Sequence, residues 1–436
     1  MSGKNCFDVL NKIFIPKKVE SIENIKGYTI KYGHIVENGE IVDEVLVSYF
    51  KEPKSYTAEN MCEINSHGGN IVMKKILELC LRNGAQLAEP GEFTKRAFLN
   101  GRIDLLQAES VIDIINSKSE REAKTGIKQL EGVLSKKIQS IRDKIMEVMV
   151  QVEVDIDYPE YDVEEVTNNQ ISDMLNSVEK DLTVLEKSFD EGKLLKEGVK
   201  TAIIGKPNAG KSSLLNAILD EDRAIVTEIE GTTRDTIEEF VTISGVPLKL
   251  IDTAGIREAK DEVEKIGIRK SKDIAKEADL IIAIFDATKN FSNEDIEILN
   301  IARNKKTIIV LNKCDLKTVI DENNVELEDF KGDIIKISAL YQNGLEDLYK
   351  KIGEKFDFNE ISVDNDIIIT NVRQKNLIHE ALESVLKAKN TLNDKQPLDI
   401  IAIFLKEILE RLGDITGDSV TEDIIDEIFS RFCLGK

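Results

Sequence analysis

The sequence has few of the residues that build metal centres, disulfide frameworks and membrane spans. Its three histidines, His34, His67 and His379, have no metal-ligand spacing, which argues against a structural zinc site. Its five cysteines are scattered without a Cys-x-x-Cys pair, a pattern typical of a reducing cytosol. No apolar run reaches the roughly 18 residues of a membrane span, and no segment resembles a signal peptide. We therefore expect a cytoplasmic protein with no membrane-spanning segment.

Positive charge is scarce relative to negative charge. Lys and Arg total 59 against 81 Asp and Glu, which gives a net charge of −22 over 436 residues. Such an acidic balance opposes broad, non-specific binding to nucleic acid. Any contact with RNA would need a local basic patch or a partner that carries it.

The chain shows three patterns, two of them in single continuous regions. Residues 1 to about 100 mix strand-like runs at 28–30, 45–49 and 61–65 with one amphipathic helix at 71–81, which indicates an α+β domain. Residues 199 to about 358 alternate apolar strands with helices, the order typical of a doubly wound parallel sheet. Its expected strands are 200–204, 248–251, 280–285, 308–311 and 334–337.

Helical periodicity lies on both sides of this α/β region. Before it, apolar residues from Ile138 to Val152 recur at steps of three and four, 155–165 with Pro159 ends that helix, and 171–189 is helical again. After it, a second apolar stripe runs from Leu398 to Leu412. Because each stripe must be buried, we expect one discontinuous helical domain into which the α/β domain is inserted. The alternative is two independent helical domains.

The most informative segment is Gly-Lys-Pro-Asn-Ala-Gly-Lys-Ser at 205–212. It follows a strand-like run and leads into a helix, which is the context of a phosphate-binding P-loop. Gly205 and Gly210 let the main chain approach a phosphate, Lys211 supplies a positive charge, and Ser212 is placed to ligate Mg²⁺.

Four further segments follow in the order that a guanine-nucleotide site requires. The threonines of 231–235 are placed to close over the γ-phosphate, and Asp252 and Gly255 end a strand near the metal and that phosphate. In Asn312-Lys313-Cys314-Asp315, the aspartate can accept two hydrogen bonds from guanine that adenine does not offer. Residues 338–340 would close the base pocket with a backbone amide. Together these segments predict a GTP site.

The residue that activates water differs from that of Ras-like proteins, which use a glutamine in this region. Here Ile256 follows Gly255, and isoleucine cannot polarise water. The acidic candidates are Glu258, Asp261, Glu262 and Glu264; each is also compatible with a solvated helix face.

Beyond these motifs, the chain resembles the MnmE (TrmE) family of tRNA-modification GTPases over nearly its whole length. The shared stretches include 55–63, 67–69, 90–101, 104–109, the P-loop, 231–235 and the terminal 432–436. The resemblance implies an α+β tetrahydrofolate-binding-like dimerisation domain over 1–102, helical parts over 103–197 and 359–436, and a Ras-like G domain over 198–358.

The resemblance also implies roles for single residues. Asn208 matches a K⁺ ligand, with the backbone of Thr227, Ile229 and Thr232 completing that site; Thr233 matches a second Mg²⁺ ligand and Glu264 the catalytic glutamate. The whole GTP site is then expected to comprise Asn208, Ala209, Gly210, Lys211, Ser212, Ser213, Thr227, Glu228, Ile229, Glu230, Gly231, Thr232, Thr233, Asp252, Thr253, Ala254, Gly255, Asn312, Lys313, Asp315, Ser338, Ala339 and Leu340.

For the first domain, the resemblance implies a one-carbon tetrahydrofolate bound near Glu63, Arg102 and Lys436, and a role for Cys433 in the modification chemistry. Family members usually begin with a strand and a Gly-Arg-Gly-Gly loop before the Ser-Gly that is here Ser2-Gly3. This chain starts after them, so we expect one strand and one folate contact to be missing.

The implied function is a K⁺-activated, Mg²⁺-dependent GTPase. With an MnmG (GidA)-type FAD protein, in a heterotetramer built on its own homodimer, it would modify the wobble uridine of tRNA with a 5-carboxymethylaminomethyl-type group. Two alternatives remain: a ribosome-assembly or regulatory switch, and a truncated GTPase that neither binds folate nor dimerises.

Overall fold

The computed structural model describes residues 1–17, 27–157, 164–221, 239–251, 273–330, 333–356, 367–432 and 435. The chain divides into two compact units. The first joins residues 1–115, 126–181 and 377–436, and the second joins 116–125 and 182–376. The chain therefore leaves the first unit, forms the second and returns, as the two separated helical stripes predict.

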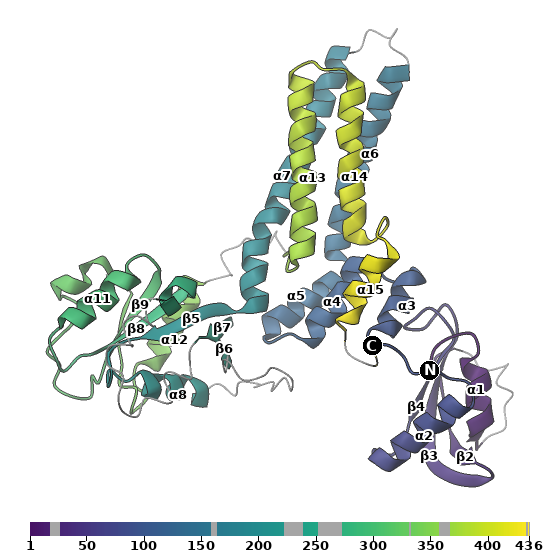
Figure 1. Cartoon of the computed structure of the whole chain (residues 1–436), viewed down its shortest axis with the longest axis horizontal. Coiled ribbons are helices and arrows are strands. Elements are labelled where there is room, and N and C mark those ends of the chain that lie inside the picture. The colour runs from purple at the N-terminus through teal and green to yellow at the C-terminus, as the bar shows by residue number, and fades with distance from the viewer. Residues whose placement is uncertain are drawn as a thin grey trace. The chain divides into compact units, whose positions relative to one another are not determined.

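A four-stranded antiparallel sheet and two helices begin the first unit (Figure 1). The strands lie in chain order, β1-β2-β3-β4. Their inner residues pack with helices α1 and α2, for example Leu10, Val47 and Leu79. The bounds are α1 Cys6–Ile13, β1 Phe14–Pro16, β2 Thr29–Glu37, β3 Glu40–Phe50, β4 Met61–Asn65 and α2 Asn70–Arg82. The strands and helix expected here are confirmed, whereas α1 and β1 were not anticipated.

The rest of the first unit is helical. Its elements are α3 Glu92–Leu99, α4 Leu105–Ile115, the last part of α5 Glu120–Leu130, α6 Val133–Asp157, the first part of α7 Glu164–Glu197, most of α13 Val372–Asn393, α14 Leu398–Thr416 and α15 Glu422–Ser430. In α6 the expected stripe, including Ile138, Ile145 and Val152, is fully buried, and α14 packs along it. Lys389 of α13 forms an ion pair with Glu179 of α7. The two stripes thus belong to one discontinuous helical structure. The exact domain boundaries at 102, 197 and 358 stay predictions.

The second unit is built on a six-stranded sheet of order β10-β9-β8-β5-β7-β6. The five expected strands are parallel, and β6 pairs antiparallel with β7 at the edge, which was not anticipated. The strands are β5 Val199–Ile204, β6 Glu239–Ile243, β7 Val246–Leu250, β8 Leu280–Asp286, β9 Lys306–Asn312 and β10 Ile334–Lys336.

Helices cover both faces of this sheet. One face, with Ile203 and Val310, packs against α8 Lys211–Glu221 and α12 Leu345–Lys355. The other, with Ala202 and Phe285, packs against α11 Asn293–Ala302 and the 3₁₀ helix Val325–Phe330. Because both faces are covered, the central strands β8 and β9 are apolar over most of their length, as in other parallel sheets. Ligands in such folds bind at the carboxyl ends of the strands. No helix in the described part of the chain is long and apolar enough to cross a membrane.

Candidate guanine-nucleotide site

The P-loop joins the end of β5 to the start of α8, as its sequence context predicts. Both of its glycines are required by geometry. A Cβ at Gly205 would lie 2.4 Å from the Ile284 carbonyl oxygen of β8. At Gly210 φ is +109°, and a Cβ would lie 2.0 Å from Asn312 Nδ2. Only glycine therefore lets this loop pass so close to its neighbours, and the main chain stays exposed to a phosphate at the amino end of α8.

The P-loop lysine is held over the loop itself. Lys211 Nζ donates to the Gly205 carbonyl over 2.7 Å and to the Lys206 carbonyl over 2.8 Å. Burial lowers the pKa of Lys211 below its ordinary value, because desolvation penalises its charged form. Among the described residues its hydrogen bonds go to carbonyl groups, and phosphate oxygens would supply negative charge to this ammonium group.

Asn312 connects the P-loop to the expected base pocket. Its side chain is buried; Nδ2 donates to the Ala209 carbonyl over 2.8 Å, and Oδ1 accepts from the Ala339 amide over 2.9 Å. Three of the sequence motifs are thereby brought together by one side chain. Asn312 ends β9, and β9, β8 and β5 are neighbouring parallel strands. The loops that follow β5 and β9 therefore lie at the same edge of the sheet, where the strands have their carboxyl ends.

Lys313 and Asp315 border the same edge. Lys313 takes a left-handed backbone with φ of +67°, and its Nζ donates to Asp286 Oδ2 over 2.6 Å. Burial alone would raise the pKa of Asp286, but hydrogen bonds from Lys313 and Thr288 outweigh it and hold that pKa below its ordinary value. Asp315 is exposed, so its carboxylate is accessible to the hydrogen-bond donors of a guanine.

The backbone of 338–340 is partly engaged within the protein. Ser338 exchanges two backbone hydrogen bonds with Asn343, over 2.9 and 3.2 Å, and the Ala339 amide is bonded to Asn312. Leu340 is 75% exposed. Any contact of the Ala339 amide with a base would therefore have to be shared with Asn312.

Two family models match the chain. The model described as the MnmE helical domain matches residues 105–433, and the one described as the GTP-binding protein TrmE N-terminus matches residues 1–102. The chain belongs to the MnmE family of tRNA modification GTPases.

Individual members are similar along the whole chain. The tRNA modification GTPases MnmE of Clostridioides difficile, Acetivibrio thermocellus and Thermoanaerobacter pseudethanolicus are 50%, 48% and 49% identical to it. Each alignment covers 100% of this chain and 95% of the relative. Because no part of the chain is left outside the alignment, the G domain and the flanking parts are both typical of MnmE proteins. The chain is accordingly an enzyme, a GTPase that takes part in tRNA modification.

The divalent metal of a GTPase fits the residues present. Among the described residues no group of three or more His, Cys, Asp or Glu side chains could hold a metal ion. Mg²⁺ often binds through one or two protein ligands and the substrate phosphates instead. Ser212, exposed at the start of α8, is the described residue that would hold it.

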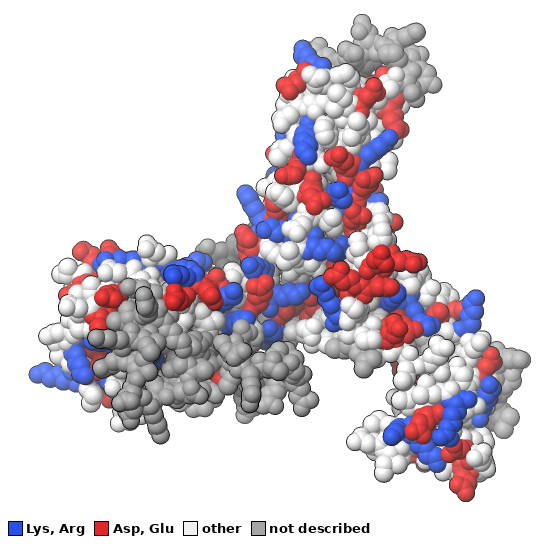
Figure 2. Space-filling model, viewed as in Figure 1, with Lys and Arg blue, Asp and Glu red and all other residues white. Residues whose placement is uncertain are grey.

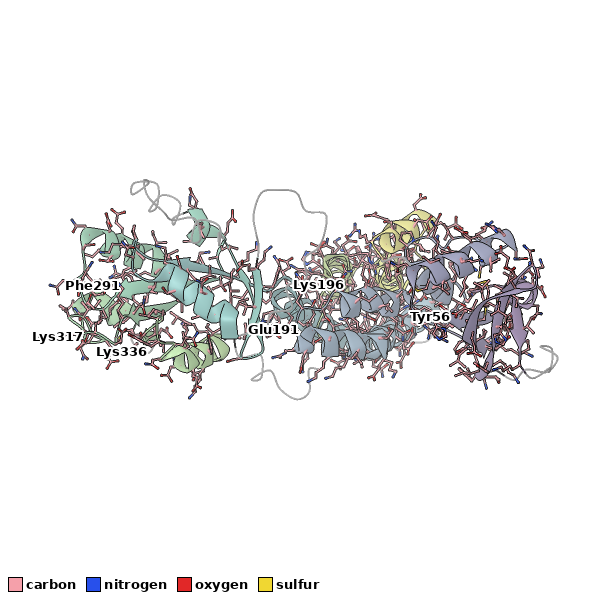
Figure 3. The ribbon with its side chains drawn as sticks, turned by 90° about the horizontal axis from the view of Figure 1, so that it is seen from below. Tyr56, Glu191, Lys196, Phe291, Lys317 and Lys336 are labelled. Atoms are coloured by element: carbon pink, nitrogen blue, oxygen red, sulfur yellow. The ribbon has the colours of Figure 1, made fainter. Side chains whose placement is uncertain are left out.

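Several expected site residues lie outside the described residues. They are Thr227 to Thr233, Asp252 to Gly255, Glu264, Cys433 and Lys436. Glu63 and Arg102 are described, and both are exposed. Glu63 pairs with Ser48 across β4 and β3. The Arg102 guanidinium lies over the ring of Tyr56, 4.6 Å from its centre; Tyr56 is labelled in Figure 3.

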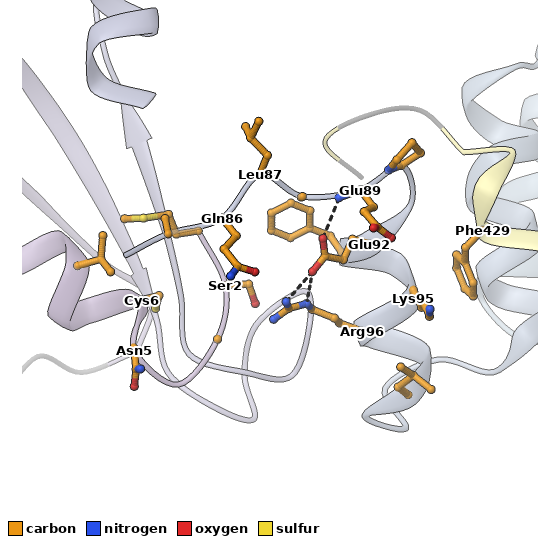
Figure 4. A pocket seen from close by; sticks show the side chains of 18 of the residues that line it. Ser2, Asn5, Cys6, Gln86, Leu87, Glu89, Glu92, Lys95, Arg96 and Phe429 are labelled. Atoms are coloured by element: carbon orange, nitrogen blue, oxygen red, sulfur yellow. Dashed lines mark hydrogen bonds and ion pairs between the residues drawn. The ribbon is translucent and has the colours of Figure 1, made fainter. Parts of the chain in front are cut away.

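The first unit also contains a cavity of about 960 Å³ (Figure 4). Its lining includes Cys6, Gln86 and Phe429, and Arg96, which donates to Glu92 over 2.6 and 3.0 Å. Neither Glu63 nor Arg102 lines it. The two expected folate contacts that the structure describes are therefore not part of this cavity.

Sequence reasoning missed two acidic residues beside the nucleotide loops, Asp286 and Asp295. Asp286 ends β8 as Asn312 ends β9, so the strand-end rule could have found it. Asp295 belongs to a Ser-x-x-Asp helix start, which indicates a helix cap but not the P-loop contact that the structure shows.

Proposed function

We propose that this MnmE-family GTPase acts with an MnmG-type FAD protein to install a 5-carboxymethylaminomethyl-type group on the wobble uridine of tRNA in the cytoplasm. The observation that carries the proposal is the match of residues 1–102 and 105–433, which include the parts on both sides of the G domain, to MnmE domains. A GTPase that only switches or assembles ribosomes would not need these parts. Deleting the gene should remove the modified wobble uridine from bulk tRNA. An unchanged nucleoside profile would favour a switch or assembly factor instead.

The charge distribution supports a partner that grips the tRNA. The net charge is −22, and over the visible coloured surface Lys and Arg are interspersed with Asp and Glu (Figure 2). Mixed charge of this kind attracts phosphate weakly. We expect the chain alone to bind tRNA weakly, and a stoichiometric complex with the FAD protein to bind it tightly. Tight salt-insensitive binding by the chain alone would contradict this division of labour.

For GTP, we propose that the main-chain amides of the P-loop, Lys211 and Ser212 hold the phosphates and Mg²⁺, and that Asp315 reads the guanine. The preformed loop and its glycines support this assignment. Lys211→Ala should abolish binding of a fluorescent guanine nucleotide. Asp315→Asn should weaken guanine binding, because the amide offers one acceptor oxygen where the carboxylate offers two.

We propose that Asn208 is a K⁺ ligand. It is exposed in the P-loop, and its backbone is left-handed with φ of +62°. A monovalent cation beside the phosphates would stabilise the negative charge of the transition state. Replacing K⁺ with Na⁺ should slow hydrolysis sharply, and Asn208→Ala should remove that difference between the ions. Equal rates in K⁺ and Na⁺ for the unaltered protein would reject the cation site.

We further propose that Glu264 positions the attacking water, since Ile256 cannot. Glu264→Ala should leave GTP affinity nearly intact and abolish turnover. Glu258→Ala is the matched control from the same segment, and it should retain turnover. Normal turnover of Glu264→Ala would show that another residue positions the attacking water.

The first domain is proposed to dimerise and to bind a one-carbon tetrahydrofolate. The outer face of its sheet carries exposed apolar residues: Ile30 is 62% exposed, Tyr32 41% and Leu46 46%. Tyr32 and Leu46 are direct partners in the β2–β3 register. Ser48 is two residues after Leu46 and therefore lies on the same face of the sheet, and Glu63 of β4 is paired with Ser48. Exposed apolar surface of this kind is typical of an interface.

A charge on this face tests the dimer. Leu46→Lys should give a monomer by light scattering, whereas Ile71→Lys, at an 84% exposed site on α2, should not. A folate titration of the unaltered dimer and of Glu63→Ala tests the ligand. Equal affinity in both would remove Glu63 from the site.

A further inference from the structure

Lys206, the second residue of the P-loop, forms an ion pair with a residue that no nucleotide motif includes. Its Nζ lies 2.6 Å from Asp295 Oδ2 and donates to Ser292 Oγ over 2.9 Å. The Asp295 side chain is only 7% exposed. Because the carboxylate is buried and the Lys206 side chain is 25% exposed, solvent and salt weaken this pair less than a fully exposed one.

Asp295 is itself firmly held. It is the third residue of α11, and its Oδ2 accepts from the Ser292 amide over 2.8 Å and from the Ser292 hydroxyl over 2.9 Å. This reciprocal capping box fixes the carboxylate at the helix start, where negative charge is favoured. Helix α11 in turn packs on β8 through Ile298 and Leu299. Asp295 is therefore a rigid point from which the P-loop can be held.

The main chain of Lys206 contacts the P-loop lysine. Its carbonyl accepts from Lys211 Nζ over 2.8 Å and from the Ala209 amide over 3.3 Å. Two residues later Asn208 has φ of +62°, a left-handed conformation that asparagine adopts more readily than most other non-glycine residues. The loop thus turns sharply two residues after the lysine that the ion pair fixes.

The P-loop and the start of α11 line a common cavity. A cavity of about 190 Å³ separates Asn208 and Ala209 from the segment before α11, where Phe291, labelled in Figure 3, is one of the lining residues. The Lys206–Asp295 pair spans this region as a direct link between the P-loop and α11.

We propose that Lys206 and Asp295 are positioning residues of the GTPase reaction, whose ion pair keeps the P-loop in the shape that presents Asn208 and Lys211 to the nucleotide. The inference rests on the assignment of the P-loop to GTP. It adds Asp295, which lies outside all the nucleotide motifs, to the residues that set nucleotide affinity.

The test is a double-mutant cycle in the full-length protein, read as the Kd of a fluorescent guanine nucleotide. Lys206→Met and Asp295→Asn should each weaken binding about tenfold, the size expected for a hydrogen-bonded charged pair. Asparagine keeps an acceptor for the Ser292 amide, so the helix cap survives. If the two residues act through one pair, the double variant should bind no worse than either single variant. Lys206→Arg should recover most of the affinity.

A matched control separates positioning from general stability. Lys355 and Asp333 form a 2.7 Å ion pair in the same unit, with Lys355 18% exposed against 25% for Lys206. Asp333 precedes β10, so this pair lies at the amino end of a parallel strand, away from the nucleotide edge. Lys355→Met should lower the thermal midpoint without changing Kd.

Three outcomes decide the inference. Unchanged affinity in Lys206→Met and Asp295→Asn, additive losses in the double variant, or an equal loss in Lys355→Met would each overturn it. Lys211→Ala is measured alongside them. If that variant binds nucleotide normally, the P-loop assignment itself fails, which is a different result from a failure of the ion pair alone.

Discussion

The carboxamide of Asn312 donates to the carbonyl of Ala209 over 2.8 Å and so ties the guanine motif to the P-loop. The same side chain accepts from the Ala339 amide over 2.9 Å. Base recognition and phosphate binding therefore depend on one buried side chain, and a change at Asn312 affects both the empty protein and its complex.

Asn312→Ala is expected to destabilise the protein before any nucleotide is added. It leaves a buried carbonyl and a buried amide without partners, at a cost of about 1–3 kcal/mol. Urea unfolding without nucleotide measures this loss. Asn324→Ala is the control, because Asn324 accepts a single 2.9 Å bond from Asp321 in an exposed turn. A loss confined to the nucleotide-bound protein would show that Asn312 acts only through the base.

Gly210→Ala is expected to abolish nucleotide binding and to destabilise the G domain. Its Cβ would overlap Asn312 Nδ2 at 2.0 Å, in addition to the strain of φ at +109°. Gly245 separates the two effects, since it has φ of +79° but no atom within 4 Å of an added Cβ. Gly245→Ala should cost about 1–2 kcal/mol from strain alone, and Gly210→Ala roughly 1–3 kcal/mol more from overpacking. Equal unfolding free energies would show that the loop moves away from Asn312.

Linear motifs and strong periodicity explain what the sequence could predict. The P-loop and the Asn312 motif are each a continuous run of residues, so both can be recognised from the sequence without knowing the fold. The stripe from Ile138 to Val152 repeats long enough to define a helix face. Both features reappear as expected in the structure.

The features that were missed depend on contacts between distant segments. The Lys206–Asp295 pair exists because β8 lies beside β5 in the sheet, and no local pattern gives that strand order. Strand β6 is five residues long and is defined by its pairing with β7. Helix α1 is only eight residues long, which is too short for its periodicity to stand out.

The Asp286–Lys313 pair should make stability depend on pH in the acid range. The pKa of Asp286 is held below its ordinary value in the folded protein. The carboxylate's contribution to the free energy of unfolding is therefore fully present above the unfolded-state pKa of about 3.9, and it is lost as pH falls through the folded-state pKa. Asp286→Asn should therefore cost about 1–2 kcal/mol at neutral pH, and the cost should shrink below about pH 4.

Urea unfolding of wild type and Asp286→Asn at several pH values measures this difference. Asp329→Asn is the control, because its carboxylate is 60% exposed in the pair with Arg303 and exposed pairs contribute little. A cost of Asp286→Asn that stays constant down to about pH 3 would show that the charge of Asp286 does not matter.

Two neighbouring residues of α6 test whether the discontinuous helical structure is one cooperative core. Ile145 is fully buried, and Met146 is 50% exposed. Ile145→Ala should destabilise the protein by about 2–4 kcal/mol, because it removes apolar contacts and leaves a cavity. Met146→Ala should stay within about 0.5 kcal/mol of wild type. Since α14 packs along this face of α6, the Ile145→Ala loss should appear equally in hydrogen exchange of α6 and of α14. Faster exchange in α6 alone would mean that the segments before and after the G domain unfold independently.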